Sequence, residues 1–318
     1  MIGKLKLSAS AAALALLVTA GAGSSSVKAA DVVAEPGCTL SGMVMAGYMY
    51  DWQNADFDDD SSENDIDAKD IDWNTPFGEG AGLVTCGGFN IQADVAYYAH
   101  SADVDVDDID IDQTNTHIGG AVFYRDPALW AGGLQASWIG QDVEAKNVDV
   151  FRIGLFGEFY LDDVFTLGGS AAYYNKDWPE GKDEDGFELA LFGRFYATPD
   201  FALTLRGDAV FTDFNFDFGG PSEDGDLDGY AITGDAEYLV WDQGLSLFAG
   251  ARWATRDFDV GDESINVDDF QVFAGIKFYF GQGGTLMERQ RTGTVDNTSL
   301  WNEKLPEFFT SGALASDL

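Results

Sequence analysis

This sequence is short of basic residues, cysteine, histidine and long apolar runs. Lysine and arginine number 17 against 55 acidic residues, so the formal charge of the 318-residue chain is −38. A nucleic-acid binder must neutralise phosphates with basic side chains, which argues against that class. Two cysteines and two histidines, His100 and His117, are too few for a disulfide-rich scaffold, a four-ligand zinc site or a histidine-based metal centre.

The N-terminus has the features of a secretory signal peptide over residues 1–30. Lys4 and Lys6 precede a short apolar stretch, and small residues around Ala29 and Ala30 suit a cleavage site. An uncleaved anchor is the alternative. Cleavage after Ala30 would also remove Lys28, so the formal charge would fall by 3 from −38 to −41. We therefore expect an exported protein.

After the signal peptide, no apolar run is long enough for a membrane helix. Hydrophobic residues nevertheless make up 46% of the chain, which is enough to form a packed structure. Only helices and closed barrels can span lipid, because backbone polar groups must be paired internally. The sequence leaves a soluble exported protein or a β-barrel.

Apolar and polar residues alternate in segment after segment from Cys38 to Phe280. Such alternation predicts strands with one apolar and one polar face. In residues 187–197, for example, Phe187, Leu189 and Leu191 share a face opposite Glu188. We predict twelve strands, of which the second is the weakest: 38–52, 76–86, 89–106, 109–125, 129–141, 149–161, 164–176, 186–197, 201–215, 228–241, 243–257 and 268–280.

The predicted connections alternate in length, which is typical of outer-membrane barrels. Short turns fall near residues 86–88, 126–127, 162–163, 198–200 and 242–244, and longer, Asp-rich loops near 53–75, 142–148, 177–185, 216–227 and 258–267. The third and fourth strands meet in a tight hairpin at Asp107-Asp108.

Aromatic residues gather at both ends of the strands, as in the interfacial belts of such barrels. The belt near the long loops comprises Tyr50, Trp52, Trp138, Phe151, Tyr173, Tyr174, Tyr230 and Trp253; the belt near the short turns comprises Phe89, Trp130, Tyr160, Phe165, Tyr196, Phe201, Trp241 and Phe280. A soluble β-sandwich or lectin-like domain is the alternative, but two belts would have no purpose there.

The last predicted strand, FQVFAGIKFYF, places Gly275, Phe278 and Phe280 in a G-x-x-F-x-F spacing. This spacing resembles the assembly signal of bacterial outer-membrane barrels, and residues 31–280 resemble a porin-like barrel of the alphaproteobacterial type. The resemblance implies an antiparallel up-and-down transmembrane barrel in the bacterial outer membrane. It also implies outer-membrane lipid and the barrel-assembly machinery as partners.

The chain departs from this pattern after Phe280, because such signals usually end the chain and 38 residues follow here. The resemblance implies that the last strand descends to the periplasm, so we expect residues 281–318 to form a periplasmic extension. This extension could plug the barrel, dock on its rim, bind an envelope component or form a loosely ordered tail.

The polar face of each strand is expected to point into the barrel, because a charge facing lipid at the midplane would cost about 2–4 kcal/mol. A water-filled channel with a selective charged wall is one interpretation, and a packed, salt-bridged interior that conducts nothing is the other. The candidate pore-lining residues are Asp94, Arg152, Glu158, Glu188, Arg194, Arg206, Asp208, Asp235, Glu237, Arg252 and Lys277.

The Asp-rich stretches 56–72 and 103–112 could concentrate cations at the mouth, bind Ca²⁺ or Mg²⁺, or only keep the surface wet. Asp224, Asp226 and Asp228, with Gly229 and Asp235, match the spacing of a calcium loop. No flanking helices are evident, and if strand pairing starts at Tyr230, Asp235 cannot return as a ligand. Apart from this candidate Ca²⁺ site, no cofactor is expected.

Cys38 and Cys86 lie at the short-turn ends of the first two predicted strands. An exported protein meets an oxidising compartment, so we predict a disulfide between them. Two unpaired thiols in mismatched register are the alternative.

A barrel enzyme would use Ser and His near the outer leaflet, and Ser101 adjoins His100. If Asp107-Asp108 is the hairpin tip, His100 lies near Asn115 and His117 near Tyr98. No G-x-S-x-G motif is present and nothing in the sequence orients either histidine, so we name no catalytic residue.

We therefore predict a non-enzymatic, porin-like channel for passive diffusion of small hydrophilic solutes, with cations favoured. The alternative is a non-conducting structural or adhesive barrel whose acidic loops bind divalent cations.

Overall fold

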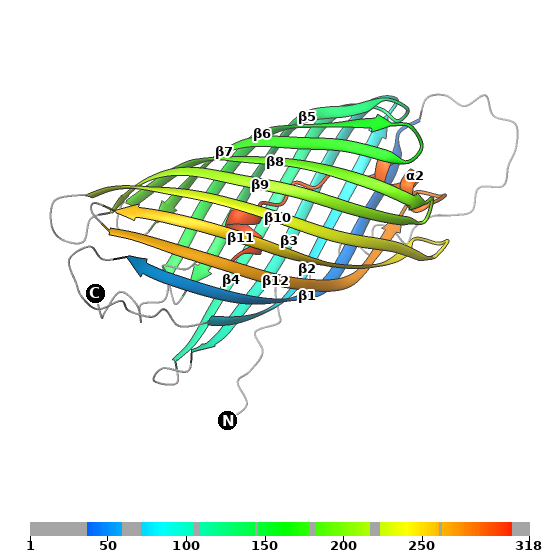
Figure 1. Cartoon of the computed structure of the whole chain (residues 1–318). Helices are drawn as coiled ribbons and strands as arrows, with labels where there is room; N and C mark the ends of the chain where they lie inside the picture. The colour runs from blue at the N-terminus through cyan, green and yellow to red at the C-terminus, as the bar shows by residue number, and fades with distance from the viewer. Residues whose placement is uncertain are drawn as a thin grey trace, which may run out of the picture.

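The computed structural model describes residues 37–58, 71–104, 109–143, 146–178, 182–216, 223–260 and 263–306 (Figure 1). The expected signal peptide, residues 1–30, lies outside the described residues. No helix among those that are described is long and apolar enough to cross a membrane.

The described residues form a closed antiparallel barrel of twelve strands, in which each strand pairs with its neighbours in sequence and the last pairs with the first (Figure 1). The strands are β1 (Thr39–Asp58), β2 (Ile71–Cys86), β3 (Phe89–Val104), β4 (Ile109–Asp126), β5 (Trp130–Val143), β6 (Lys146–Leu161), β7 (Phe165–Trp178), β8 (Lys182–Thr198), β9 (Phe201–Phe216), β10 (Glu223–Trp241), β11 (Leu245–Val260) and β12 (Glu263–Phe280). All twelve predicted strands are confirmed, including the weak second one.

The strands are longer than predicted at the long-loop end. The stretches near 142–148, 177–185 and 258–267, which we predicted as loops, mostly belong to strands, and half of the predicted loop 216–227 does too. In this region most of the outward side chains are aspartates, so the apolar alternation is lost. The backbone ladder continues regardless, because it depends on N–H and C=O groups and not on side-chain polarity. β1 also continues past the predicted end at Trp52 to Asp58.

The barrel has an apolar exterior band, which is the reverse of a soluble sandwich. Leu155, Leu191 and Leu205 lie outward with 59%, 74% and 64% of their surface exposed. Polar and charged side chains lie on the inner face, as the alternation predicted. This arrangement suits lipid outside and excludes the soluble β-sandwich.

Most of the predicted belt aromatics lie outward or at the edge of the band, but three do not. Tyr160, Tyr174 and Tyr196 are buried inside the barrel. Their neighbours in sequence explain this error: Phe159 and Leu161 are exposed on either side of Tyr160. Because side chains alternate along a strand, the Tyr160 side chain must point inward. Its direction is therefore set by the alternation and not by its closeness to the end of the strand.

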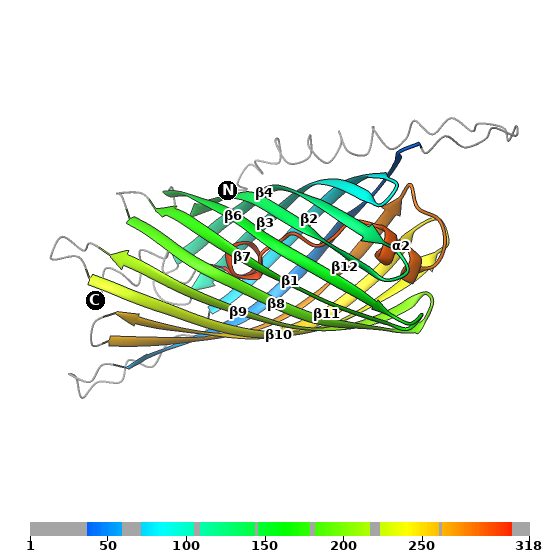
Figure 2. The ribbon, with the colours of Figure 1, turned by 90° about the horizontal axis from the view of Figure 1, so that it is seen from above.

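The chain after β12 turns back into the barrel. Residues Gly281–Pro306, here called the lumenal segment, include helix α2 (Leu286–Thr292) and the short π-helix η1 (Leu300–Lys304). Figure 1 and Figure 2 show α2 at the short-turn end and the following chain running inside the barrel. Of the alternatives given for residues 281–318, the structure shows a plug in the barrel for Gly281–Pro306. Residues 307–318 lie outside the described residues.

Candidate functional site

Helix α2 fixes the start of the lumenal segment to the short-turn rim. Thr285 caps the helix: its hydroxyl accepts from the Glu288 amide, and the Glu288 carboxylate accepts from the Thr285 amide. Arg289 donates to the carbonyls of Gln282 at 2.7 Å and Asp242 at 2.6 Å. These bonds tie α2 to the turn between β10 and β11.

A second basic side chain of α2 ties the helix to another part of the rim. Arg291 donates from Nη2 to the carbonyl oxygens of Asp162 at 2.7 Å and Phe165 at 2.8 Å, both at the turn between β6 and β7. Because Arg289 and Arg291 bind carbonyls of two different turns, α2 bridges the end of the barrel.

The π-helix η1 is held deep in the lumen by Glu303. One carboxylate oxygen accepts from the Ser299 amide at 3.0 Å and lies 2.8 Å from His117 Nδ1. The other ring nitrogen, Nε2, lies 2.6 Å from an Asp94 carboxylate oxygen. Carboxylates only accept hydrogen bonds, so this arrangement requires both ring nitrogens of His117 to donate.

The backbone and apolar side chains of η1 are also held by the wall. The Glu303 carbonyl accepts from Asn115 Nδ2 at 3.0 Å, and the Asn302 carbonyl accepts from Gln141 Nε2 at 2.8 Å. Leu300, Trp301 and Leu305 pack against inward apolar residues that include Ile139, Val150 and Val210. The segment is therefore packed in the lumen as a plug, with η1 held by hydrogen bonds from β4 and β5 and by apolar contacts that extend from β5 to β11.

The structure places all eleven predicted lining residues on the inner face. Asp94, Arg152 and Glu188 contact the lumenal segment: Arg152 pairs with Glu188 at 2.7 Å, and Glu188 accepts from Asn302 at 2.7 Å. The other eight line the space beside the segment: Glu158, Arg194, Arg206, Asp208, Asp235, Glu237, Arg252 and Lys277. Two of these also contact the segment, because Arg206 pairs with Asp296 at 3.2 Å and Glu237 accepts from Gln290 at 3.0 Å. The part of the lining residues in conduction stays a prediction.

This space is a cavity of about 250 Å³ between the lumenal segment and a wall formed by β1–β3 and β6–β12. Six carboxylates and five cations line it, because the segment adds Asp296 and Lys304 and β2 adds Glu79. Several charges are paired, such as Lys277 with Glu237 at 2.9 Å and Arg206 with Asp208 at 2.7 Å. The lining is thus nearly neutral.

One wall of the cavity is apolar, which the sequence reasoning missed. Its residues are Met43, Met45, Met49, Phe77, Phe248 and Phe273. The signal was present: the three methionines occupy alternate positions opposite the outward residues of β1. Inward residues of a water-filled barrel are expected to be polar, so three inward methionines on one strand indicate an apolar part of the lining.

His100 does not form a catalytic pair with the adjacent Ser101. His100 is buried inside, with Nδ1 2.9 Å from the Thr75 hydroxyl, while the adjacent Ser101 is exposed on the outer face. Successive side chains of a strand point to opposite faces, so His100 and Ser101 cannot meet. Asn115 does lie beside His100 as predicted, at 3.2 Å.

Aspartates surround the outer surface at the long-loop end, beyond the aromatic belt. We call this set the acidic collar; its exposed members are Asp72, Asp112, Asp142, Asp149, Asp177, Asp185, Asp213, Asp226, Asp228, Asp257, Asp259 and Asp268. Belt residues bond to it: Trp138 Nε1 donates to Asp149 at 3.1 Å, and the Tyr173 hydroxyl donates to Asp185. The belt rings thus present their apolar parts to lipid and their polar ends to the collar.

The candidate calcium residues are part of this extended region. Asp226 and Asp228 lie in β10, which begins at Glu223, and both are exposed. Asp226 is paired in register with Asp213 on β9 and Asp259 on β11. The structure describes no side chain for Asp224. Calcium binding stays a prediction; any site would lie between neighbouring strands and not in the turn of a helix–loop–helix motif.

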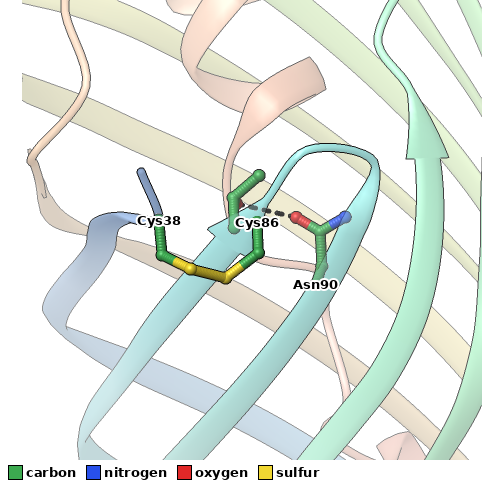
Figure 3. Close-up of a disulfide and its surroundings, with 4 residues drawn as sticks. Cys38, Cys86 and Asn90 are labelled. Carbon is green, nitrogen blue, oxygen red and sulfur yellow. Dashed lines mark hydrogen bonds between the residues drawn. A yellow bond between two sulfur atoms is a disulfide. The ribbon is translucent and has the colours of Figure 1, made fainter. Parts of the chain in front are cut away.

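The predicted disulfide is present. Cys38 and Cys86 are bonded with their Cα atoms 4.3 Å apart, and Figure 3 shows them joining the ends of β1 and β2 beside Asn90. Thr39 pairs with Thr85 in the ladder, so the two cysteines continue the same register. The disulfide fastens the first strand at the short-turn end.

Comparisons with known proteins support the fold. No family model matches the sequence, and no curated protein matches it. An outer-membrane channel from Pseudomonas putida F1 is similar over 80% of this chain and 100% of that chain, with 10% identity and a TM-score of 0.54. An anion-selective porin from Comamonas acidovorans is similar over 77% of this chain and 99% of that chain, with 12% identity and a TM-score of 0.37. The first likeness shows that this chain has the fold of an outer-membrane β-barrel, and the apolar exterior band agrees with that fold.

Proposed function

We propose that this barrel is a narrow, porin-like channel through which small hydrophilic solutes diffuse passively, with cations favoured. The cavity beside the lumenal segment carries the proposal, because it is the interior space in the described structure that charged side chains line from both the wall and the segment. A space of about 250 Å³ suits small solutes. The assignment is non-enzymatic, and the alphaproteobacterial origin stays a prediction.

The cation preference comes from the acidic collar. The cavity lining itself is nearly neutral, so it selects weakly. The collar surrounds the long-loop end with aspartates and raises the local concentration of cations near that mouth. Because exposed charges are screened by salt, the preference should be clear at low ionic strength and weaken as salt rises.

A specific observation favours a second candidate, a non-conducting structural barrel. The lumenal segment is packed against the wall with much of its surface buried, including Leu286, Leu300, Trp301 and Leu305. A barrel closed in this way would serve as a scaffold for the acidic collar. In either case outer-membrane lipid and the barrel-assembly machinery are the partners we propose.

Planar bilayer recordings separate the two candidates. The full-length protein and a variant that ends at Gly281 are reconstituted and their single-channel steps are compared. The channel proposal expects small steps from the full-length protein, with a reversal potential of cationic sign in a salt gradient, and larger steps from the truncated variant. Steps from the truncated variant alone would favour the structural barrel. An anionic reversal potential would contradict the role given to the collar.

A further inference from the structure

The cavity brings cationic side chains and apolar rings together in pairs. Arg252 lies over the Phe273 ring at 5.6 Å, Lys277 over Phe248 at 5.6 Å, and Arg194 over Phe192 at 5.4 Å. A solute that bonds to one of these cations would place its remaining atoms beside the ring and the methionines of β1. The two parts of the site therefore suit a molecule with a charged end and an apolar body.

Two of these cations form no ion pair with a carboxylate among the residues that the structure describes. Arg252 is only 7% exposed, and its side chain donates to neutral acceptors, the Thr233 hydroxyl at 3.0 Å and the Gln271 amide oxygen. Arg194 donates to the Thr204 hydroxyl at 3.4 Å. Buried charges in proteins are usually paired, so a buried guanidinium at a cavity wall that bonds directly to no carboxylate indicates a place for an anionic group.

We propose that this cavity binds small organic acids that carry an apolar body. The carboxylate bonds to the guanidinium of Arg252, with Arg194 as a second cation of the same wall. The apolar body packs on Phe273, Phe248 and Met45. This inference rests on the proposed channel and adds one class of solute that its cavity retains by direct contacts, an aromatic or branched monocarboxylate small enough for a cavity of about 250 Å³.

The acidic collar does not contradict this site. The collar lies on the outer surface beyond the aromatic belt, and its field is screened over about 10 Å at 0.1 M salt. It slows the entry of anions at low salt. At equilibrium and moderate salt, the affinity of the cavity is set by the groups that touch the solute.

Equilibrium binding to the full-length protein in phosphatidylcholine nanodiscs tests the proposal, with empty nanodiscs as the baseline. Three probes are compared. 3-Phenylpropionate has both the carboxylate and the phenyl ring, propionate has the carboxylate alone, and phenethylamine has the phenyl ring with a cation in place of the carboxylate. We expect 3-phenylpropionate to bind about tenfold or more tightly than either of the others, because a charge-assisted hydrogen bond and a buried ring each contribute at least that factor. Equal binding of propionate or of phenethylamine would overturn the proposal.

Variants assign the two parts of the site. Arg252→Gln should lower the affinity for 3-phenylpropionate about tenfold or more and leave the affinity for phenethylamine unchanged. Phe273→Gln should instead lower the affinity for 3-phenylpropionate toward that for propionate. Lys176→Gln, which removes a buried cation at the long-loop end of β7, is the matched control and should change neither. Heat-dependent gel migration confirms that each variant is folded, and Arg252→Lys, which keeps the charge, should retain the preference for carboxylates over phenethylamine. An unchanged affinity in folded Arg252→Gln would refute the site.

The outcome is separable from that of the channel proposal. Binding in nanodiscs without any single-channel steps would support the site in a barrel that does not conduct. Conductance without discrimination among the three probes would support the channel and reject the site.

Discussion

The anchor of the lumenal segment at Glu303 can be tested directly. Substitution Glu303→Ala removes the carboxylate that faces His117 Nδ1 at 2.8 Å and the Ser299 amide at 3.0 Å. Both Glu303 and His117 are buried. Breaking a buried charge pair by removing one partner costs about 3–5 kcal/mol. Asp94 still faces the other ring nitrogen, so we expect the lower end of that range.

A loss of about 3 kcal/mol raises the population of the released segment about 100-fold. The assay uses a single engineered cysteine, Thr298→Cys, because the native cysteines are both in the disulfide. A maleimide carrying a polyethylene glycol chain too large to enter the lumen modifies this thiol only after the segment leaves its site. The labelling rate should therefore rise about 100-fold in the Glu303→Ala background.

Glu288→Ala is the matched control, since it removes an exposed glutamate of the same segment whose capping role contributes only about 1 kcal/mol. Heat-dependent gel migration shows whether the barrel remains folded. If Glu303→Ala is labelled no faster than Glu288→Ala, the buried pair does not hold the segment and the anchor assigned here is wrong.

Three further predictions concern the wall. Replacing Cys38 and Cys86 by serine opens a link across a sequence separation of 48 and should lower the free energy of unfolding by about 4 kcal/mol in the chain-entropy model, measured by denaturant unfolding in detergent with the reduced native protein for comparison. Leu191→Lys should lower the free energy of unfolding in lipid by about 2–4 kcal/mol, and Leu161→Lys, at the short-turn end, by about 0–1 kcal/mol. Equal losses for the two variants, measured by unfolding in lipid vesicles, would contradict the orientation of the apolar band. Gly119→Ala places a Cβ 2.6 Å from the Asn297 side-chain nitrogen, a clash that should displace the lumenal segment. The maleimide should therefore label Thr298→Cys faster in this variant. An unchanged labelling rate would mean that the segment adapts without leaving its site.

The site was only partly predictable. The sequence predicted the inward direction of all eleven charged wall residues, because alternation is a local property of the strand. It did not predict that Asp94, Arg152 and Glu188 contact a plug while Arg194 and Arg252 face a cavity. That division depends on which side of the lumen the segment occupies, and only contacts between distant residues decide it.

The sequence by itself determined the strand phase, the twelve strands, the lipid-facing band and the pairing of Cys38 with Cys86. Each of these follows from the two-residue repeat of an extended chain and the order of neighbouring strands. The tertiary structure decided where Gly281–Pro306 lies. Its partners are remote in sequence, as in the bond from Gln92 Nε2 to the Val295 carbonyl across 203 positions. No local repeat encodes such a contact, because it forms only when the closed barrel offers buried polar groups that the segment can satisfy.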